Sequence, residues 1–155
     1  MIQRDYILRL IDHLGSLLRA LLGSDERIKR PEQLISDAAQ LDVALEKSCQ
    51  EAMGLSFRTI KEMPPDELVG LLRSGGAIWV SRCFLLGRMF EFDAEIAERG
   101  KQRDRAKQSI QRTLYFYNLL RSNPEVPDEY RVGDRFQHAA KVLAELDPRP
   151  SRDGA

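Results

Sequence analysis

The chain is poor in the residues that build catalytic and metal sites. Its 155 residues include two cysteines and two histidines. Cys49 and Cys83 form no C-x-x-C pair and have no histidine at ligand spacing, which argues against a zinc site. We interpret them as two buried thiols in a reducing cytoplasm. His13 has no cysteine, histidine or carboxylate four residues away, and the spacing of Asp134 and His138 allows one side-chain pair, not a metal site.

Other signatures of catalysis and of membrane insertion are also missing. No serine, cysteine or lysine has a general base at a spacing typical of a catalytic pair. Gly75-Gly76 is interpreted as a turn rather than a phosphate-binding loop. We therefore expect neither an enzyme nor a cofactor. No uncharged run reaches the ~18 residues of a membrane-spanning helix. Asp5, Asp12 and His13 interrupt the first apolar residues, so a secretory signal is not expected. We expect a cytoplasmic protein without a membrane partner.

The chain has no surplus of one charge. Its 24 basic and 24 acidic residues cancel, which makes nucleic acid an unlikely partner for the chain as a whole. Hydrophobic residues at 43% and charged residues at 31% are typical of a helix-rich globular protein. The length fits one domain, which we place at residues 1–146. Residues 147–155, with two prolines and Gly154, are expected to be a disordered tail.

The apolar periodicity predicts an all-α fold, a compact array of five or six helices. The segment 77–99 is apolar around much of its circumference and should be the central helix. Asp128 is the expected N-cap of the last helix. The expected helices cover residues 2–22, 31–54, 66–73, 77–99, about 101–121 and 128–146, with a short turn of helix at 55–63.

Several short motifs occur in a recognisable order. They are Asp5-Tyr6-Ile7-Leu8-Arg9, then Asp66-Glu67-Leu68 with Leu71-Leu72 and Gly75-Gly76, then Cys83-x-x-Leu86-Gly87-x-x-Phe90 and Ala106-x-x-x-Ile110. In this order the chain resembles an uncharacterised family of small bacterial tetratricopeptide-like helical proteins, over roughly residues 1–123. The resemblance implies stacked helical hairpins and transfers no activity. The repeat is imperfect, because Ala106 comes nearly two helical turns late for the standard pattern.

Gly87 stands inside the expected central helix, where glycine costs ~1 kcal/mol relative to alanine. We therefore expect another helix to approach closely at this point. Gly87→Leu should overpack the contact, whereas Gly87→Ala should be mild or stabilising if there is room.

The first helix carries a candidate interface. The row Ile7, Leu10, Leu14, Leu17 and Leu21 follows a,d heptad spacing, and Ile11, Leu18 and Leu22 widen the apolar stripe. One neighbouring helix can cover only one row of such a stripe. A homodimer with this helix at a two-fold interface is favoured, and complete burial within one chain is nearly as well supported.

Charged residues gather around residues 91–107. Lys101, Arg103 and Lys107, with Arg99 and Arg105, form a basic cluster that could bind phosphate, RNA or an acidic peptide. The stronger interpretation is a solvated turn neutralised by neighbouring acids. The acidic residues Glu91, Asp93, Glu95 and Glu98 are likewise expected on a solvated face, with Arg88 and Arg99 as partners.

Tyr115, Phe116 and Tyr117 are consecutive, so they cannot all face one core. Burial of two and partial exposure of one is expected, with a partner groove as the sharper alternative. Taken together, the sequence predicts a non-enzymatic helical interaction or scaffold module that binds itself or another protein. No small-molecule substrate is evident. The alternative is an RNA- or phosphate-binding regulator.

Overall fold

The computed structural model describes residues 4–22, 31–74 and 76–146, and within these ranges it is all-α, without a strand. The predicted disordered tail, 147–155, lies outside the described residues. The described residues form seven α-helices and two 3₁₀ turns, where five or six helices were expected. They are α1 (Arg4–Leu22), α2 (Pro31–Met53), α3 (Phe57–Glu62), α4 (Pro65–Ser74), η1 (Gly76–Ile78), α5 (Trp79–Arg99), α6 (Arg103–Arg121), η2 (Asp128–Tyr130) and α7 (Val132–Leu146).

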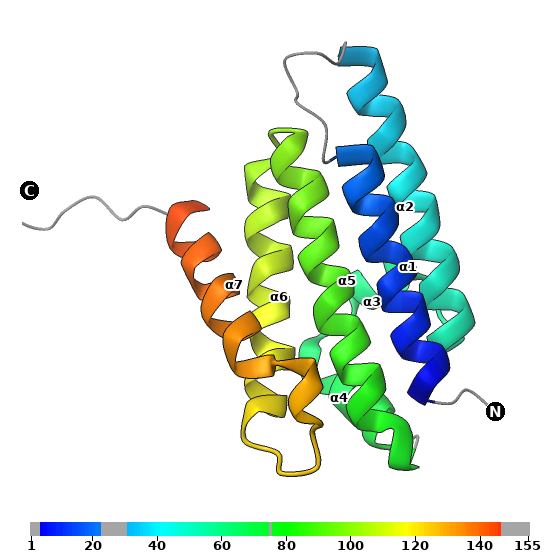
Figure 1. Ribbon diagram of the computed structural model, residues 1–155, viewed down its shortest axis with the longest axis vertical. Helices are drawn as coiled ribbons and strands as arrows, with labels where there is room; N and C mark the ends of the chain where they lie inside the picture. Colours follow the sequence, from blue (N-terminus) through cyan, green and yellow to red (C-terminus); the bar gives the residue numbers. More distant parts are fainter. Residues whose placement is uncertain (1–3, 23–30, 75, 147–155) are drawn as a thin grey trace, which may run out of the picture.

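Helix α5 is the centre of the fold, as its apolar circumference predicts. It contacts α1 and α2 on one side and α6 on the other, while α7 packs on the far side of α6 (Figure 1). The short helices α3 and α4 lie behind α5 in this view. Because it is surrounded in this way, 14 of its 21 residues are buried.

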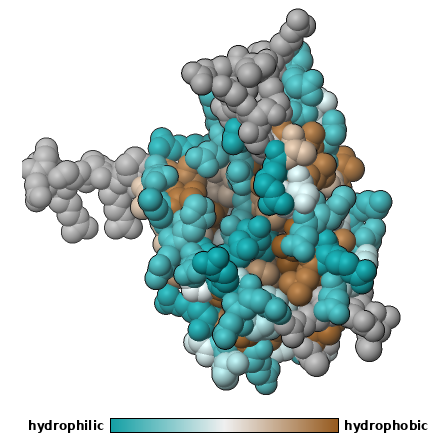
Figure 2. Space-filling model, viewed as in Figure 1, coloured by the Kyte–Doolittle hydropathy of each residue, from teal (hydrophilic) through white to brown (hydrophobic). Residues whose placement is uncertain are grey.

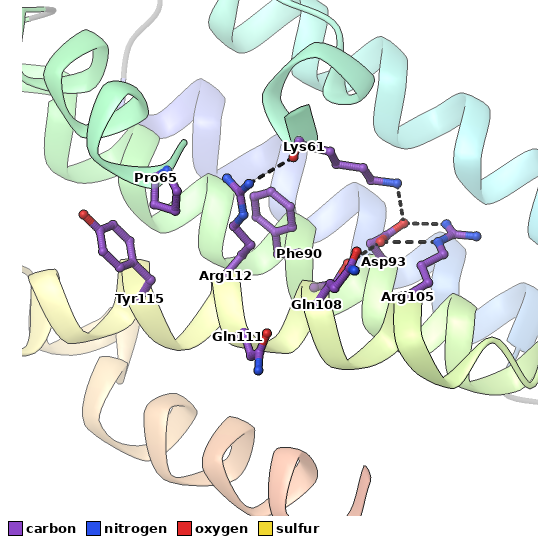
Figure 3. Close-up of a pocket in the computed structure, with 10 residues that line it drawn as sticks. Lys61, Pro65, Phe90, Asp93, Arg105, Gln108, Gln111, Arg112 and Tyr115 are labelled. Atoms are coloured by element: carbon purple, nitrogen blue, oxygen red, sulfur yellow. Dashed lines mark hydrogen bonds and ion pairs between the residues drawn. The ribbon is translucent and has the colours of Figure 1, made fainter. Parts of the chain in front are cut away.

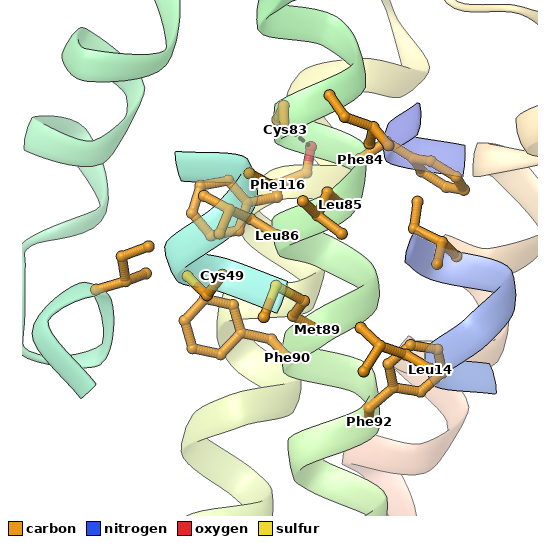
Figure 4. Close-up of a cluster of buried hydrophobic side chains, with 14 of the residues drawn as sticks. Leu14, Cys49, Cys83, Phe84, Leu85, Leu86, Met89, Phe90, Phe92 and Phe116 are labelled. Atoms are coloured by element: carbon orange, nitrogen blue, oxygen red, sulfur yellow. Dashed lines mark hydrogen bonds between the residues drawn. The ribbon is translucent and has the colours of Figure 1, made fainter. Parts of the chain in front are cut away.

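The core is built on aromatic side chains along α5 (Figure 4). Phe84 stacks on Tyr130 with ring centroids 4.2 Å apart, and Phe90 lies 5.0 Å from Phe57 and 5.9 Å from Phe116. These three contacts tie η2, α3 and α6 to the same central helix. Aromatic pairs at such spacings add ~0.5–1.5 kcal/mol beyond the area they bury.

Helix α3 is held at its N-terminus by two side chains. Ser56 accepts a hydrogen bond from the backbone N–H of Thr59 at 3.1 Å. Glu46 of α2 accepts from the N–H groups of Phe57 and Arg58 at 2.8 and 2.9 Å. These bonds satisfy helix-terminal donors that lack a partner within the helix and fix α3 against α2.

The last helix begins later than predicted. Asp128 opens a 3₁₀ turn instead of capping an α-helix, and α7 starts at Val132. The turn buries Tyr130, whose hydroxyl lies 2.9 Å from the hydroxyl of Ser81. Arg131 then takes the left-handed conformation, with φ of 52°, which interrupts a continuous helix from 128.

The predicted close approach at Gly87 is confirmed, because the ring of Tyr117 on α6 packs directly against it. There is no room for a side chain at this position. Alanine was expected to be mild or stabilising only if there was room, and that condition is not met.

The face shown in Figure 2 is mostly hydrophilic, with hydrophobic side chains gathered near α1 and on α7. None of the described helices is both long and apolar enough to span a lipid bilayer.

Candidate functional site

A buried carboxylate joins three elements at the centre of the molecule. Asp93 of α5 is fully buried and accepts hydrogen bonds from Ser109 of α6 and from Arg105, each at 2.5 Å. Lys61, at the end of α3, lies 3.1 Å from the same carboxylate. Asp93 therefore links α3 and α6 to the central helix. We call these four residues the Asp93 cluster.

The cluster keeps the carboxylate charged. Burial alone would raise the pKa of Asp93, but the hydrogen bonds from Arg105 and Ser109 and the charge of Lys61 outweigh it, so the pKa is lowered. Arg105 also pairs with Asp42 of α2 at 3.0 Å. Burial acts to lower the pKa of Arg105, and the two carboxylates outweigh that effect and raise it.

Arg112 lies two helical turns beyond Arg105 on α6 and has different partners. Its guanidinium donates to the backbone carbonyls of Met63 and Lys61, at 2.7 and 3.0 Å. These carbonyls lie at the C-terminal end of α3, where a cation is favourable. Burial lowers the pKa of Arg112, and no acidic side chain among the described residues offsets this effect.

The Asp93 cluster and Arg112 border a cavity of about 340 Å³ that is lined by residues of α3, α4, α5 and α6 (Figure 3). The α6 residues share one helical face by their spacing. Phe90 and Pro65 add apolar surface. The lining residues are Lys61, Pro65, Phe90, Asp93, Arg105, Gln108, Ser109, Gln111, Arg112 and Tyr115.

The three consecutive aromatic residues of α6 divide as the sequence predicts. Phe116 and Tyr117 are buried in the core, whereas Tyr115 is 37% exposed and borders the cavity. The sharper alternative, that the exposed ring lines a partner groove, stays a prediction.

A second cluster of polar side chains lies between α5 and α6. The buried hydroxyl of Tyr117 donates to the carboxylate of Glu91, whose other oxygen accepts from Arg88 at 3.0 Å. Burial raises the pKa of Tyr117, and the negative charge of Glu91 raises it further. The pair of Arg88 with an acid of the 91–98 segment was expected from the sequence.

The prediction that all four acids of that segment are solvated is wrong for two of them. Asp93 is fully buried and Glu91 is partly buried, while Glu95 and Glu98 are exposed. The signal was present in the spacing, since Asp93 lies three residues after Phe90 and three before Ile96, both on the buried side of α5.

The structure divides the candidate interface on α1 into two rows. Ile7 and Leu14 are buried within the chain, whereas Leu10, Leu17 and Leu21 are half-buried and pack at the edge of the core. The apolar residues that complete the inward row are Ile11 and Leu18.

The candidate anion-binding residues are only partly brought together. Lys101 and Arg103 are exposed and line one hollow with Glu98 and Leu146. Lys107 is half-buried and does not line that hollow. Arg105 turns away into the Asp93 cluster.

The two histidines and the two cysteines do not come together in one site. His13 and His138 are exposed on α1 and α7, and Asp134 forms its ion pair with Arg131 at 2.8 Å. Cys49 and Cys83 are buried free thiols, as predicted. Within the described ranges, no three His, Cys, Asp or Glu side chains are grouped to hold a metal ion.

No protein-family model, curated protein or solved structure matches this chain. The all-helical part of the sequence-based resemblance agrees with the structure. The tetratricopeptide-like part has no support from these comparisons, and no family is identified.

Proposed function

We propose that this protein is a non-catalytic, cytoplasmic helical interaction module that associates with a second copy of itself through α1. The observation that carries the proposal is the outer row of that helix. Leu10, Leu17 and Leu21 recur at seven and four residues and are only half-buried, although they border the core. Half-buried leucines in a line are typical of a helix that packs on one more neighbour.

The state of the polar groups supports an interaction role over a catalytic one. The charged groups of the Asp93 cluster are paired with one another and hold helices together. Both thiols are buried, and burial raises the pKa of each to about 12, far from the range of an activated nucleophile.

We also infer that α5 and α6 form a lengthened tetratricopeptide-like hairpin. The two helices are joined by only Gly100, Lys101 and Gln102 and pack along their lengths. Gly87 lets them approach closely, which is the role a small residue plays between packed helices.

The self-association is tested by charging the outer row. Leu10→Glu with Leu17→Glu should give a folded monomer, because both side chains lie at the edge of the core and a charge cannot be buried at an apolar interface without large cost. The matched control is Ser16→Glu with Ala20→Glu, which adds the same charge at exposed positions of α1 and should leave the dimer intact. Mass is measured by light scattering and helicity by circular dichroism.

Two results of that experiment count against the interface. A charged variant that keeps the mass of the wild type shows that the row is not used. A variant that loses its helical signal places the row inside its own chain.

An alternative function, binding of RNA or phosphate, draws on the exposed pair Lys101 and Arg103, which share one hollow. The wild type should then be retained on heparin at low salt, and replacing Lys101, Arg103 and Lys107 with serine should abolish the retention. A wild type that passes through unretained removes this alternative.

A further inference from the structure

One cation beside the cavity has no acid to balance it in the described part of the chain. Lys61 and Arg105 are balanced by Asp93 and Asp42, through ion pairs of 2.5 to 3.1 Å. Arg112 is left with two backbone carbonyls as its hydrogen-bond partners. They use two of the five N–H groups of a guanidinium, so the group keeps both its charge and spare donors.

Apolar and amide groups surround this cation. Phe90 lies beside Arg112, with its ring centroid 5.8 Å from the guanidinium carbon, and Pro65 and Tyr115 lie on the other side (Figure 3). Gln108 of α6 adds an amide that donates and accepts hydrogen bonds. An apolar wall with a few converging polar groups is the usual composition of a small-molecule site.

The size of the cavity limits what it can hold. Its volume of about 340 Å³ is near the lower end of small-molecule pockets, which range over roughly 300–1,000 Å³. A single aromatic ring with one short substituent is of the right size. One unbalanced positive charge matches a ligand with one negative charge, and guanidinium binds carboxylates with paired hydrogen bonds.

We propose that this cavity binds a small aromatic monocarboxylate, with the carboxylate on Arg112 and the ring against Phe90, Pro65 and Tyr115. The site is independent of the outer row of α1 and goes beyond the interaction function.

The test uses phenylacetate as the probe and phenylacetamide as its uncharged counterpart, each titrated into ¹⁵N-labelled wild-type protein. Phenylacetate should give saturable shifts of backbone amide signals in α6 around Gln108–Tyr115. Its affinity should exceed that of phenylacetamide by about tenfold or more, because a charge-assisted hydrogen bond is roughly twice as strong as a neutral one. No saturable shift up to ~10 mM phenylacetate, or equal shifts with the amide, would overturn the proposal.

Variants then assign the binding to Arg112. Arg112→Gln should lose the preference for phenylacetate over phenylacetamide, whereas Arg103→Gln, which removes an exposed cation outside the cavity lining, should keep it. A folded Arg112→Gln protein that binds phenylacetate as tightly as the wild type would contradict the assignment. Because Arg112 also holds the end of α3, a variant that fails to fold is replaced by Tyr115→Ala, which removes a partly exposed ring. That variant should bind phenylacetate and phenylacetamide more weakly, by the same factor. Unchanged affinities would show that the aromatic ring of the ligand does not lie against Tyr115.

Discussion

The ring of Tyr117 occupies the space that a side chain on Gly87 would need. A Cβ atom built on residue 87 lies 2.4 Å from Cε1 and 2.8 Å from Cδ1 of that ring. The ring has little freedom to move, because its hydroxyl is bound by Glu91 and its edge lies near Phe84, with centroids 6.1 Å apart. This contact sets the distance between α5 and α6.

Gly87→Ala is therefore expected to destabilise the protein. The gain in helix propensity is ~1 kcal/mol, whereas overpacking a core costs ~1–3 kcal/mol, and the obstructing atoms belong to a fixed ring. The difference is a net loss of up to about 2 kcal/mol, which urea unfolding measures. The matched control is Gly70→Ala in α4, where no atom lies within 4 Å of the new Cβ, and it should be neutral or stabilising. A stabilised Gly87→Ala protein would show that α5 and α6 are not in this contact.

Asp93→Asn is expected to lower the free energy of unfolding by roughly 3 kcal/mol. This value is at the low end for breaking a buried ion pair, because Lys61 and Arg105 are partly exposed and can be hydrated again. The control is Asp134→Asn, which breaks an exposed pair with Arg131 and should change the stability little. Equal unfolding midpoints for the two variants would contradict the structural role of the Asp93 cluster.

The same carboxylate predicts a pH dependence. The pKa of Asp93 is lowered in the folded protein, so its contribution is complete above the unfolded value of ~3.9 and is lost as the pH falls through the folded pKa. The stability difference between wild type and Asp93→Asn should be constant near neutral pH and should shrink below about pH 4. A stability difference that grows as the pH falls would contradict the predicted pH dependence.

Both thiols should be unreactive in the folded protein. Burial raises the pKa of Cys49 and of Cys83 to about 12, with a further contribution from Glu46 for Cys49. At pH 8 a thiol-disulfide reagent should therefore label neither residue until urea unfolds the chain, after which both should react. Rapid labelling of either thiol without denaturant would show that it is accessible.

The sequence predicts the helices well because the spacing of apolar residues reflects the helical period within each short segment. In α2, for example, the apolar residues Leu41, Leu45, Cys49 and Ala52 follow one another at spacings of three and four, and all four are buried. The late start of α7 was missed because it depends on the burial of Tyr130 against residues far away in the chain.

The candidate site was less predictable for a similar reason. A carboxylate in a charged segment normally faces water, and the partners that keep Asp93 buried lie 12 to 32 residues away. The position of Arg112 beside the carbonyls of α3 likewise depends on a contact across 49 to 51 residues. Spacing along one helix shows which residues face inward but does not show which polar groups meet there.

The mass of the wild-type protein in solution tests the central claim, self-association through α1, most directly. Light scattering after size exclusion, from low to high micromolar concentration, should give about twice the mass of one chain. The dimer should persist at high salt, because the proposed contact between the outer rows of α1 is apolar. A single-chain mass at high micromolar concentration would contradict the account.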